Sequence, residues 1–240
     1  MNENNQYARL DAPVAAFAAA NERAGFLKKV YGLLFLGVLG FAVTLWAAAN
    51  VPLVNGWAMD MARLIYGNRW GWAIYMGIFI GGSYLVHSVA EQRPLGAFAY
   101  AGWVVLLGLL ISPIVLMVSG QQGGMAIINQ ASALTAIVFG GLTTYVLYTG
   151  KDFSWMRGIL VMAFFGLIVT SLLGFFMGFS MGLWFSAAIV LLSAGYILYD
   201  TSQILHRLPT SMPMTGAILL FTDVVLLFKH ILILLMGSRD

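Results

Sequence analysis

The sequence has 240 residues, of which 61% are apolar and only 9% are charged, whereas soluble domains average about 45 to 50% apolar and about 25% charged residues. So few charged residues cannot cover the surface of a soluble protein of this size. Intrinsic disorder is also excluded, because it requires low hydrophobicity and high net charge. The net charge of +3 forms no basic face, which argues against nucleic-acid binding, and the lack of cysteine excludes disulfides and thiolate metal sites. The composition therefore predicts an all-α integral membrane protein embedded in a lipid bilayer.

Seven stretches are long and apolar enough to cross a bilayer, which takes about 20 residues at 1.5 Å per residue. They lie at about residues 30–49, 70–90, 95–118, 125–148, 158–179, 181–207 and 214–236. The sequence therefore predicts a seven-helix transmembrane domain over residues 28–240, preceded by a polar cytoplasmic tail over residues 1–27.

The division between the fifth and sixth spans is the least marked, because residues 158–199 form one uncharged run of about twice the crossing length. A turn from Gly178 to Gly182 midway favours a helical hairpin over a single buried or re-entrant element. Close helix packing is predicted where small residues recur at a spacing of four. Such glycine pairs are Gly77 and Gly81, Gly174 and Gly178, and Gly178 and Gly182.

The basic residues predict the orientation, since short cytoplasmic loops of membrane proteins are enriched in Lys and Arg. With the N-terminus in the cytoplasm, the cytoplasmic segments hold Arg9, Arg23, Lys28, Lys29, Arg93, Lys151, Arg157 and Arg207. The opposite side then holds only Arg63, Arg69 and Arg239. We therefore expect a cytoplasmic N-terminus and an outside C-terminus, and the short connections leave no room for a soluble catalytic domain.

Asp200 and Asp223 lie inside the sixth and seventh predicted spans, where an ionisable group costs at least a few kcal/mol. Asp200 precedes Pro209 by nine residues, and Asp223 follows Pro213 by ten. On antiparallel helices both aspartates then reach about the same depth, roughly 13 to 15 Å from the turn. This spacing predicts that the two carboxyl groups lie side by side.

Two facing carboxylates in a bundle of low dielectric constant cannot both ionise cheaply, so we expect them to share a proton and titrate as a coupled pair. Such a pair can bind a proton, bind a hard divalent cation such as Ca²⁺ through oxygen, or act as an acid and base on a substrate. The simplest alternative is that each aspartate only satisfies a neighbouring hydroxyl or backbone group.

Polar side chains near the two aspartates predict a polar lining. Tyr196 and Gln203 flank Asp200 at i−4 and i+3 on one helical face. His230 follows Asp223 by seven residues and returns to the same face about 10 Å further along. We take Tyr196, Gln203 and His230 as candidate pathway residues, with a packing role as the alternative for His230.

The segment Gly195–Ile204, with its Tyr199-Asp200-Thr201-Ser202-Gln203 core, resembles the transmembrane Bax inhibitor motif family when taken with the later Leu219–Asp223. Bacterial members of this family are often called YccA-like, and the resemblance covers the whole chain. It implies six helices surrounding a central C-terminal seventh. It also implies a pH-sensitive Ca²⁺ leak whose gating and metal-binding site maps onto Asp200 and Asp223, in a bacterial inner membrane.

In bacterial relatives an arginine at the cytoplasmic end of the second helix latches onto the acidic pair. The corresponding stretch here is Ala90-Glu91-Gln92-Arg93, in which Arg93 is displaced from the latch position. The resemblance therefore makes Arg93 the candidate counter-charge.

Three functions remain open at this point. The first is a Ca²⁺ leak without an obligatory cofactor, gated by protonation of the aspartate pair. The second is a non-transporting regulator that binds a membrane-bound protease or acts in a stress response. The third is an intramembrane aspartyl protease, but such proteases typically place the second aspartate in Gly-x-Gly-Asp, whereas this chain has Leu220-Phe221-Thr222-Asp223. We therefore expect that the protein is not an enzyme.

Overall fold

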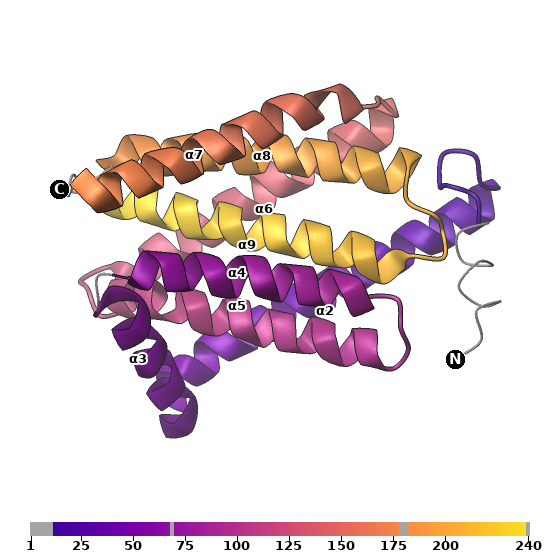
Figure 1. The fold of residues 1–240 in the computed structure, drawn as a ribbon. Helices are drawn as coiled ribbons and strands as arrows, with labels where there is room; N and C mark the ends of the chain where they lie inside the picture. The colour runs from indigo at the N-terminus through magenta and orange to yellow at the C-terminus, as the bar shows by residue number, and fades with distance from the viewer. Residues whose placement is uncertain (1–11, 68–69, 178–181, 239–240) are drawn as a thin grey trace. The chain divides into compact units, whose positions relative to one another are not determined.

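The computed structural model describes residues 12–67, 70–177 and 182–238, and most of this chain is α-helical (Figure 1). The chain forms two compact units. Unit 1 comprises residues 1–24, 126–211 and 222–240, and unit 2 comprises residues 25–125 and 212–221. Three helices, α2, α6 and α9, contribute residues to both units.

Unit 2 contains most of α2 (Ala20–Asn50), α3 (Pro52–Tyr66), α4 (Gly71–Val89), α5 (Leu95–Ser119) and the first residues of α9 (Pro213–Gly237). Helices α3, α4 and α5 pack against one another. Helix α2 approaches α5 closely, since a Cβ atom at Gly37 would lie 2.1 Å from the Tyr100 hydroxyl oxygen. Phe221 packs its ring edge to face against Tyr100, with ring centroids 5.8 Å apart.

Unit 1 contains α6 (Gly124–Thr149) from residue 126 onward, the short 3-10 helix η1 (Ser154–Met156), α7 (Arg157–Met177), α8 (Gly182–His206) and α9 from Thr222 onward. Helices α7 and α8 are separate and pack side by side, as the predicted hairpin requires (Figure 1). The contact is close at Gly195, where an added Cβ atom would lie 2.8 Å from a methyl group of Leu160. Residues 178–181 of the predicted turn lie outside the described residues.

Six of the described helical segments are long and apolar enough to cross a membrane: α2, α5, α6, η1 with α7, α8 and α9. Helix α4, at the second predicted span, counts only as a shorter apolar helix. The integral membrane class is therefore supported, while the count of seven spans, the central position of the last helix and the orientation of the termini stay predictions.

Two helical segments were not expected. Helix α3 occupies the predicted connection between the first two spans, and Pro52 stands at its first position, where a missing N–H costs nothing. Helix α2 begins at Ala20, within the predicted tail, because the polar residues before the apolar run also favour a helix.

The glycine pairing predicted for α4 is wrong. An added Cβ atom at Gly77 or Gly81 would meet nothing within 4 Å. The close approaches instead involve Gly82, which faces Trp103, and Gly108, which faces Thr44.

The segment before α2, together with the first turn of α2, is bound to the end of α8 and to the turn between α8 and α9. The N–H of Ala16 donates to the Leu205 carbonyl at 2.8 Å, and the N–H of Thr210 donates to the Pro13 carbonyl at 3.0 Å. The Thr210 hydroxyl also donates to the Glu22 carboxylate at 2.7 Å. Residues 13–22, which we call the N-terminal strap, therefore form part of unit 1.

Candidate functional site

Helices α8 and α9 position the two aspartates. Helix α8 continues to His206, so Asp200 is a helical residue rather than a loop residue. After a short turn, Pro213 occupies the first position of α9, where the fixed φ of proline suits a helix start. Because both helices are regular on either side of this turn, Asp200 and Asp223 come to similar depths in unit 1.

The two carboxyl groups are buried and in contact. The exposed fractions of Asp200 and Asp223 are 8% and 7%, and the two side chains lie close enough to interact directly. Two adjacent buried carboxyl groups repel each other when both are ionised, so we expect this pair to share a proton. The Oδ2 atom of Asp223 is buried without a hydrogen-bond partner in the described part of the chain.

Tyr196 and Gln203 lie on the same helix as Asp200. Tyr196 is half-buried, is close enough to both aspartates to interact with them electrostatically, and donates its hydroxyl to the Leu160 carbonyl at 3.5 Å. The side-chain nitrogen of Gln203 is buried and has no hydrogen-bond partner among the described residues. The hydroxyl oxygen of Thr201 is also buried and also lacks a hydrogen-bond partner among the described residues. Helix α8 therefore carries further polar atoms that are available to an ion or a water molecule.

His230 and Arg93 occupy different surroundings. His230 lies on α9 in unit 1 with 8% of its surface exposed, and its Nδ1 atom has no partner within the described ranges. Arg93 is exposed in the turn between α4 and α5, which belongs to unit 2. Its role as a counter-charge to the aspartates stays a prediction.

The site offers a cation few strong ligands. Within the described residues no group of three or more His, Cys, Asp or Glu side chains could hold a metal ion. Ca²⁺ takes six to eight oxygen ligands, so two aspartates would have to be supplemented by hydroxyl, carbonyl or water oxygens.

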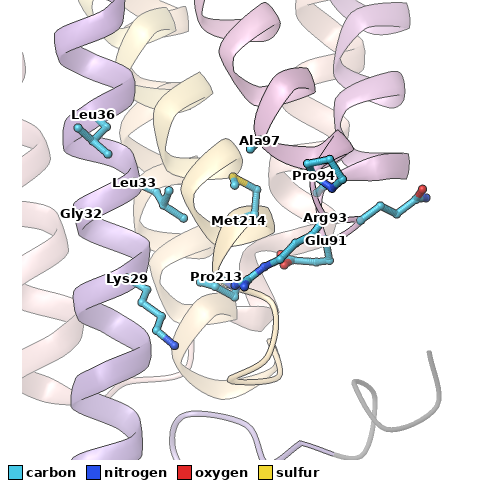
Figure 2. A pocket seen from close by; sticks show the side chains of 12 residues that line it. Lys29, Gly32, Leu33, Leu36, Glu91, Arg93, Pro94, Ala97, Pro213 and Met214 are labelled. Atoms are coloured by element: carbon cyan, nitrogen blue, oxygen red, sulfur yellow. The ribbon is translucent and has the colours of Figure 1, made fainter. Parts of the chain in front are cut away.

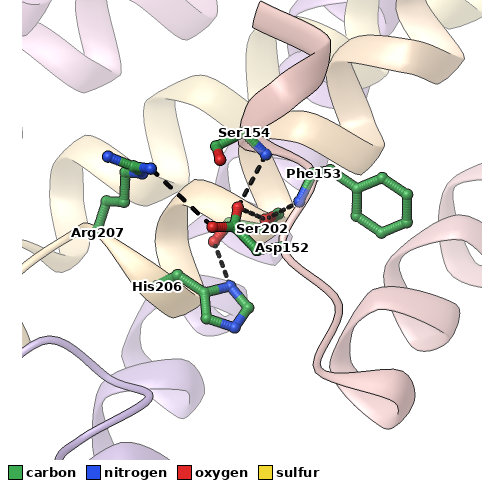
Figure 3. Close-up of polar contacts among 6 residues, drawn as sticks. All are labelled: Asp152, Phe153, Ser154, Ser202, His206 and Arg207. Atoms are coloured by element: carbon green, nitrogen blue, oxygen red, sulfur yellow. Dashed lines mark hydrogen bonds and ion pairs between the residues drawn. The ribbon is translucent and has the colours of Figure 1, made fainter.

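A second polar cluster, not expected from the sequence, joins the end of α8 to the loop before α7 (Figure 3). The Ser202 hydroxyl accepts the backbone N–H of Phe153 at 2.9 Å and donates to Asp152 Oδ1 at 3.4 Å. His206 Nδ1 contacts the Ser202 carbonyl at 3.1 Å, and the Arg207 guanidinium lies 4.0 Å from Asp152 Oδ2. The cluster attaches the loop between α6 and α7 to α8, two residues after Asp200.

The charge of Asp152 is stabilised within this cluster. The backbone N–H of Ser154 donates to Asp152 Oδ1 at 2.8 Å and is the main reason why the pKa of Asp152 lies below its ordinary value. Burial opposes this shift, while the Ser154 hydroxyl, His206 and Arg207 add to it. The sequence signal was an aspartate two residues before a helix start, because an Asp side chain can accept the backbone N–H two residues further on.

Comparison with known proteins identifies the family. The family model described as "Inhibitor of apoptosis-promoting Bax1" matches residues 23–240. An uncharacterized protein of Pseudomonas aeruginosa is 34% identical over 80% of this chain and 80% of its own length. An uncharacterized protein of Campylobacter jejuni is 31% identical over 89% of this chain and 88% of its own length.

A viral protein extends the similarity beyond bacteria. The "Golgi anti-apoptotic protein" of vaccinia virus is 29% identical over 93% of this chain and 90% of its own length. The family match covers the helices of both units, including the two that carry Asp200 and Asp223. This chain therefore belongs to the Bax inhibitor family of integral membrane proteins.

Proposed function

We propose that this protein is a pH-sensitive cation leak of the Bax inhibitor type, that Ca²⁺ is the ion, and that protonation of the Asp200 and Asp223 pair gates it. The observation that carries the proposal is the contact between two buried carboxyl groups inside helices long enough to cross a membrane. A purely structural pair would be expected to satisfy all its oxygens, whereas Asp223 Oδ2 has no partner among the described residues.

The proton count of the pair gives a gating mechanism. With one proton, the pair carries a single negative charge and a charge-assisted hydrogen bond, which is about twice as strong as a neutral one. Loss of the proton leaves two adjacent anions that repel each other, and gain of a second proton replaces the bond with a neutral one. Either change alters the packing of α8 against the C-terminal part of α9. Such a pH-dependent pair could therefore switch a pathway between closed and open arrangements.

Ca²⁺ fits the charge of the deprotonated pair. Two carboxylates supply hard oxygen ligands with a combined charge of −2, which a divalent cation neutralises. The unpartnered hydroxyl oxygen of Thr201 on α8 offers a further ligand. Tyr196 and His230 complete the set of pathway residues that we propose.

The test is Ca²⁺ flux into proteoliposomes that contain a Ca²⁺-sensitive dye. We expect the flux of the wild-type protein to vary with pH, and this variation to disappear in Asp200→Asn and Asp223→Asn. Asp60→Asn is the matched control, because Asp60 is an exposed aspartate whose ion pair with Arg63 lies in α3. A pH-dependent flux that both site variants retain would contradict the proposal.

A second function is favoured by the name of the vaccinia relative, which refers to suppression of cell death rather than transport. In that case this chain would be a non-transporting regulator that binds another membrane protein, such as a membrane-bound protease. Folded wild-type protein that gives no Ca²⁺ flux above empty vesicles at any pH would favour this second function. Deletion of residues 2–24 that removes partner binding but not flux would show that both roles exist.

We also propose that the aspartate pair is not proteolytic. Leu220 and Phe221, which precede Asp223, are fully buried in a regular helix and leave no opening for a substrate backbone. Cleavage of a model transmembrane substrate that disappears in Asp200→Ala would contradict this.

A further inference from the structure

A groove of about 660 Å³ lies in unit 2, near the ends of the helices that line it (Figure 2). Three segments line it: the early part of α2, the turn between α4 and α5, and the first residues of α9. In Figure 2, Lys29 of α2 lies on one side of Pro213, and Glu91 and Arg93 lie on the other. The same end of four helices therefore contributes both cations and apolar surface to one groove.

The face of α2 that lines the groove changes from charged to apolar along the helix. The lining residues Lys29, Gly32, Leu33 and Leu36 have the spacing of one helical stripe. Lys29 and Leu36 are about 10 Å apart along the axis. Leu36 is 63% exposed, and Gly32 leaves open space, since an added Cβ atom would meet nothing within 4 Å. This side of the groove therefore joins a cationic end to an apolar channel.

The opposite wall repeats this pattern. Arg93 is exposed, and Pro94 and Ala97 continue the apolar surface into α5. Neither Lys29 nor Arg93 forms an ion pair within the described ranges. Both cations are thus available to an anionic ligand in the groove.

The one acidic residue in the groove is already engaged. Glu91 accepts the backbone N–H of Thr215 at 2.8 Å and the Thr215 hydroxyl at 3.1 Å, which satisfies an N–H at the start of α9. The negative charge of Glu91 therefore lies at the N-terminal end of α9, where the helix dipole favours an anion. The groove accordingly keeps two cations for a ligand.

We propose that this groove binds an anionic phospholipid, with the phosphate between Lys29 and Arg93 and part of one acyl chain along Leu33 and Leu36. Basic pockets between helices at the cytoplasmic side of membrane proteins bind anionic head groups, and the predicted topology places this end of the helices there. The volume lies within the range of small-molecule sites, enough for a head group and part of a chain. A free phosphate ion would use the cations but not the exposed apolar stripe.

The first test removes the cations. The purified protein would be mixed with phosphatidylglycerol or phosphatidylcholine and bound lipid counted by native mass spectrometry. Each cation near a membrane surface contributes enough for about a fivefold change in binding, so we expect Lys29→Gln with Arg93→Gln to weaken phosphatidylglycerol binding about 25-fold. Phosphatidylcholine binding should change little.

The matched control removes equal charge elsewhere. Lys28 is the adjacent residue on α2 but does not line the groove, and Arg157 is exposed at the start of α7. Lys28→Gln with Arg157→Gln should leave phosphatidylglycerol binding within about twofold of wild type, as expected for cations outside the site. Equal losses in the two double variants would overturn the proposal, because they would indicate attraction by net charge alone.

The second test fills the apolar channel and keeps both cations. Gly32→Leu adds a side chain to open space in the groove, and Gly77→Leu adds one to open space on α4 outside it. We expect Gly32→Leu to reduce phosphatidylglycerol binding at least fivefold and Gly77→Leu to leave it unchanged. Unchanged binding in Gly32→Leu, or competition by inorganic phosphate alone, would overturn the assignment to a lipid. These tests need no Ca²⁺ flux, so their outcome is independent of the proposed leak.

Discussion

The backbone N–H of Phe153 donates to the Ser202 hydroxyl at 2.9 Å, which bonds the α6–α7 loop to α8 two residues beyond Asp200. Ser202 is fully buried, and its hydroxyl also donates to Asp152 at 3.4 Å. Any movement of α8 that changes the surroundings of Asp200 must therefore either carry this loop along or break these bonds. The cluster connects the candidate site to one end of unit 1.

Ser202→Ala should destabilise the protein. The substitution leaves the partly buried Phe153 N–H without its partner, and an unsatisfied donor costs about 1 to 3 kcal/mol when it is fully buried. The free energy of unfolding in mixed detergent measures this loss. Ser132→Ala is the control, since the Ser132 hydroxyl is exposed and bonds only its own helix, so we expect a change within about 0.5 kcal/mol. Equal effects of the two substitutions would show that the loop attachment contributes nothing.

Asp152 should give a pH-dependent contribution to stability. Its pKa is lowered in the folded protein, chiefly by the Ser154 N–H, so the stabilisation is present above the unfolded pKa of about 3.9 and is lost as pH falls through the folded value. Asp152→Asn should therefore lower the melting temperature at about pH 7, and this difference should shrink at about pH 3. A difference that stays constant over this range would contradict the assigned electrostatic cause.

The N-terminal strap should protect the α8–α9 turn. Deletion of residues 2–16 removes the Pro13 carbonyl that accepts the Thr210 N–H, so hydrogen exchange at Thr210 should accelerate. Hydrogen exchange followed by mass spectrometry of a peptide over residues 206–214 measures this. The turn at residues 119–124 in unit 2 is the internal control and should not change. Unchanged exchange at Thr210 would mean that the strap is not held in solution.

Two glycine substitutions should have opposite effects. Gly37→Ala places a Cβ atom against the Tyr100 hydroxyl, which itself donates to the Leu33 carbonyl at 3.1 Å, and such overpacking costs about 1 to 3 kcal/mol. Gly77→Ala meets nothing within 4 Å and should stabilise helix α4 by up to about 1 kcal/mol. Thermal unfolding of the two variants compares them directly. A stabilised Gly37→Ala variant would contradict the close approach of α2 to α5.

Much of the fold was predictable because long uncharged segments in a bilayer can satisfy their backbone only as helices. The predicted span at residues 95–118 differs from α5, Leu95–Ser119, by one residue. Helix α3 was missed because it is shorter than a membrane crossing and contains Asp60 and Arg63. The glycine contacts of α4 were mispredicted because spacing alone does not show which helical face meets a neighbour.

The aspartate pair was predictable because helical rise is constant, so equal distances from two prolines give equal depths. The Asp152 and Ser202 contact was not, since a loop of irregular conformation brings together residues 50 apart in the chain. The groove that we propose as a lipid site likewise depends on three separate segments, and only the stripe from Lys29 to Leu36 is visible in the sequence.

The most direct measurement of the central claim compares the protonation of the aspartate pair with Ca²⁺ flux in the same vesicles. Infrared difference spectroscopy during a pH titration would follow the carbonyl band of a protonated carboxylic acid, while the dye follows Ca²⁺. We predict that the band and the flux change with the same midpoint pH, and that Asp223→Asn and Asp200→Asn abolish both changes. Midpoints separated by more than about one pH unit, a tenfold difference in proton activity, would contradict the account. So would a carboxyl band that both variants leave unaltered.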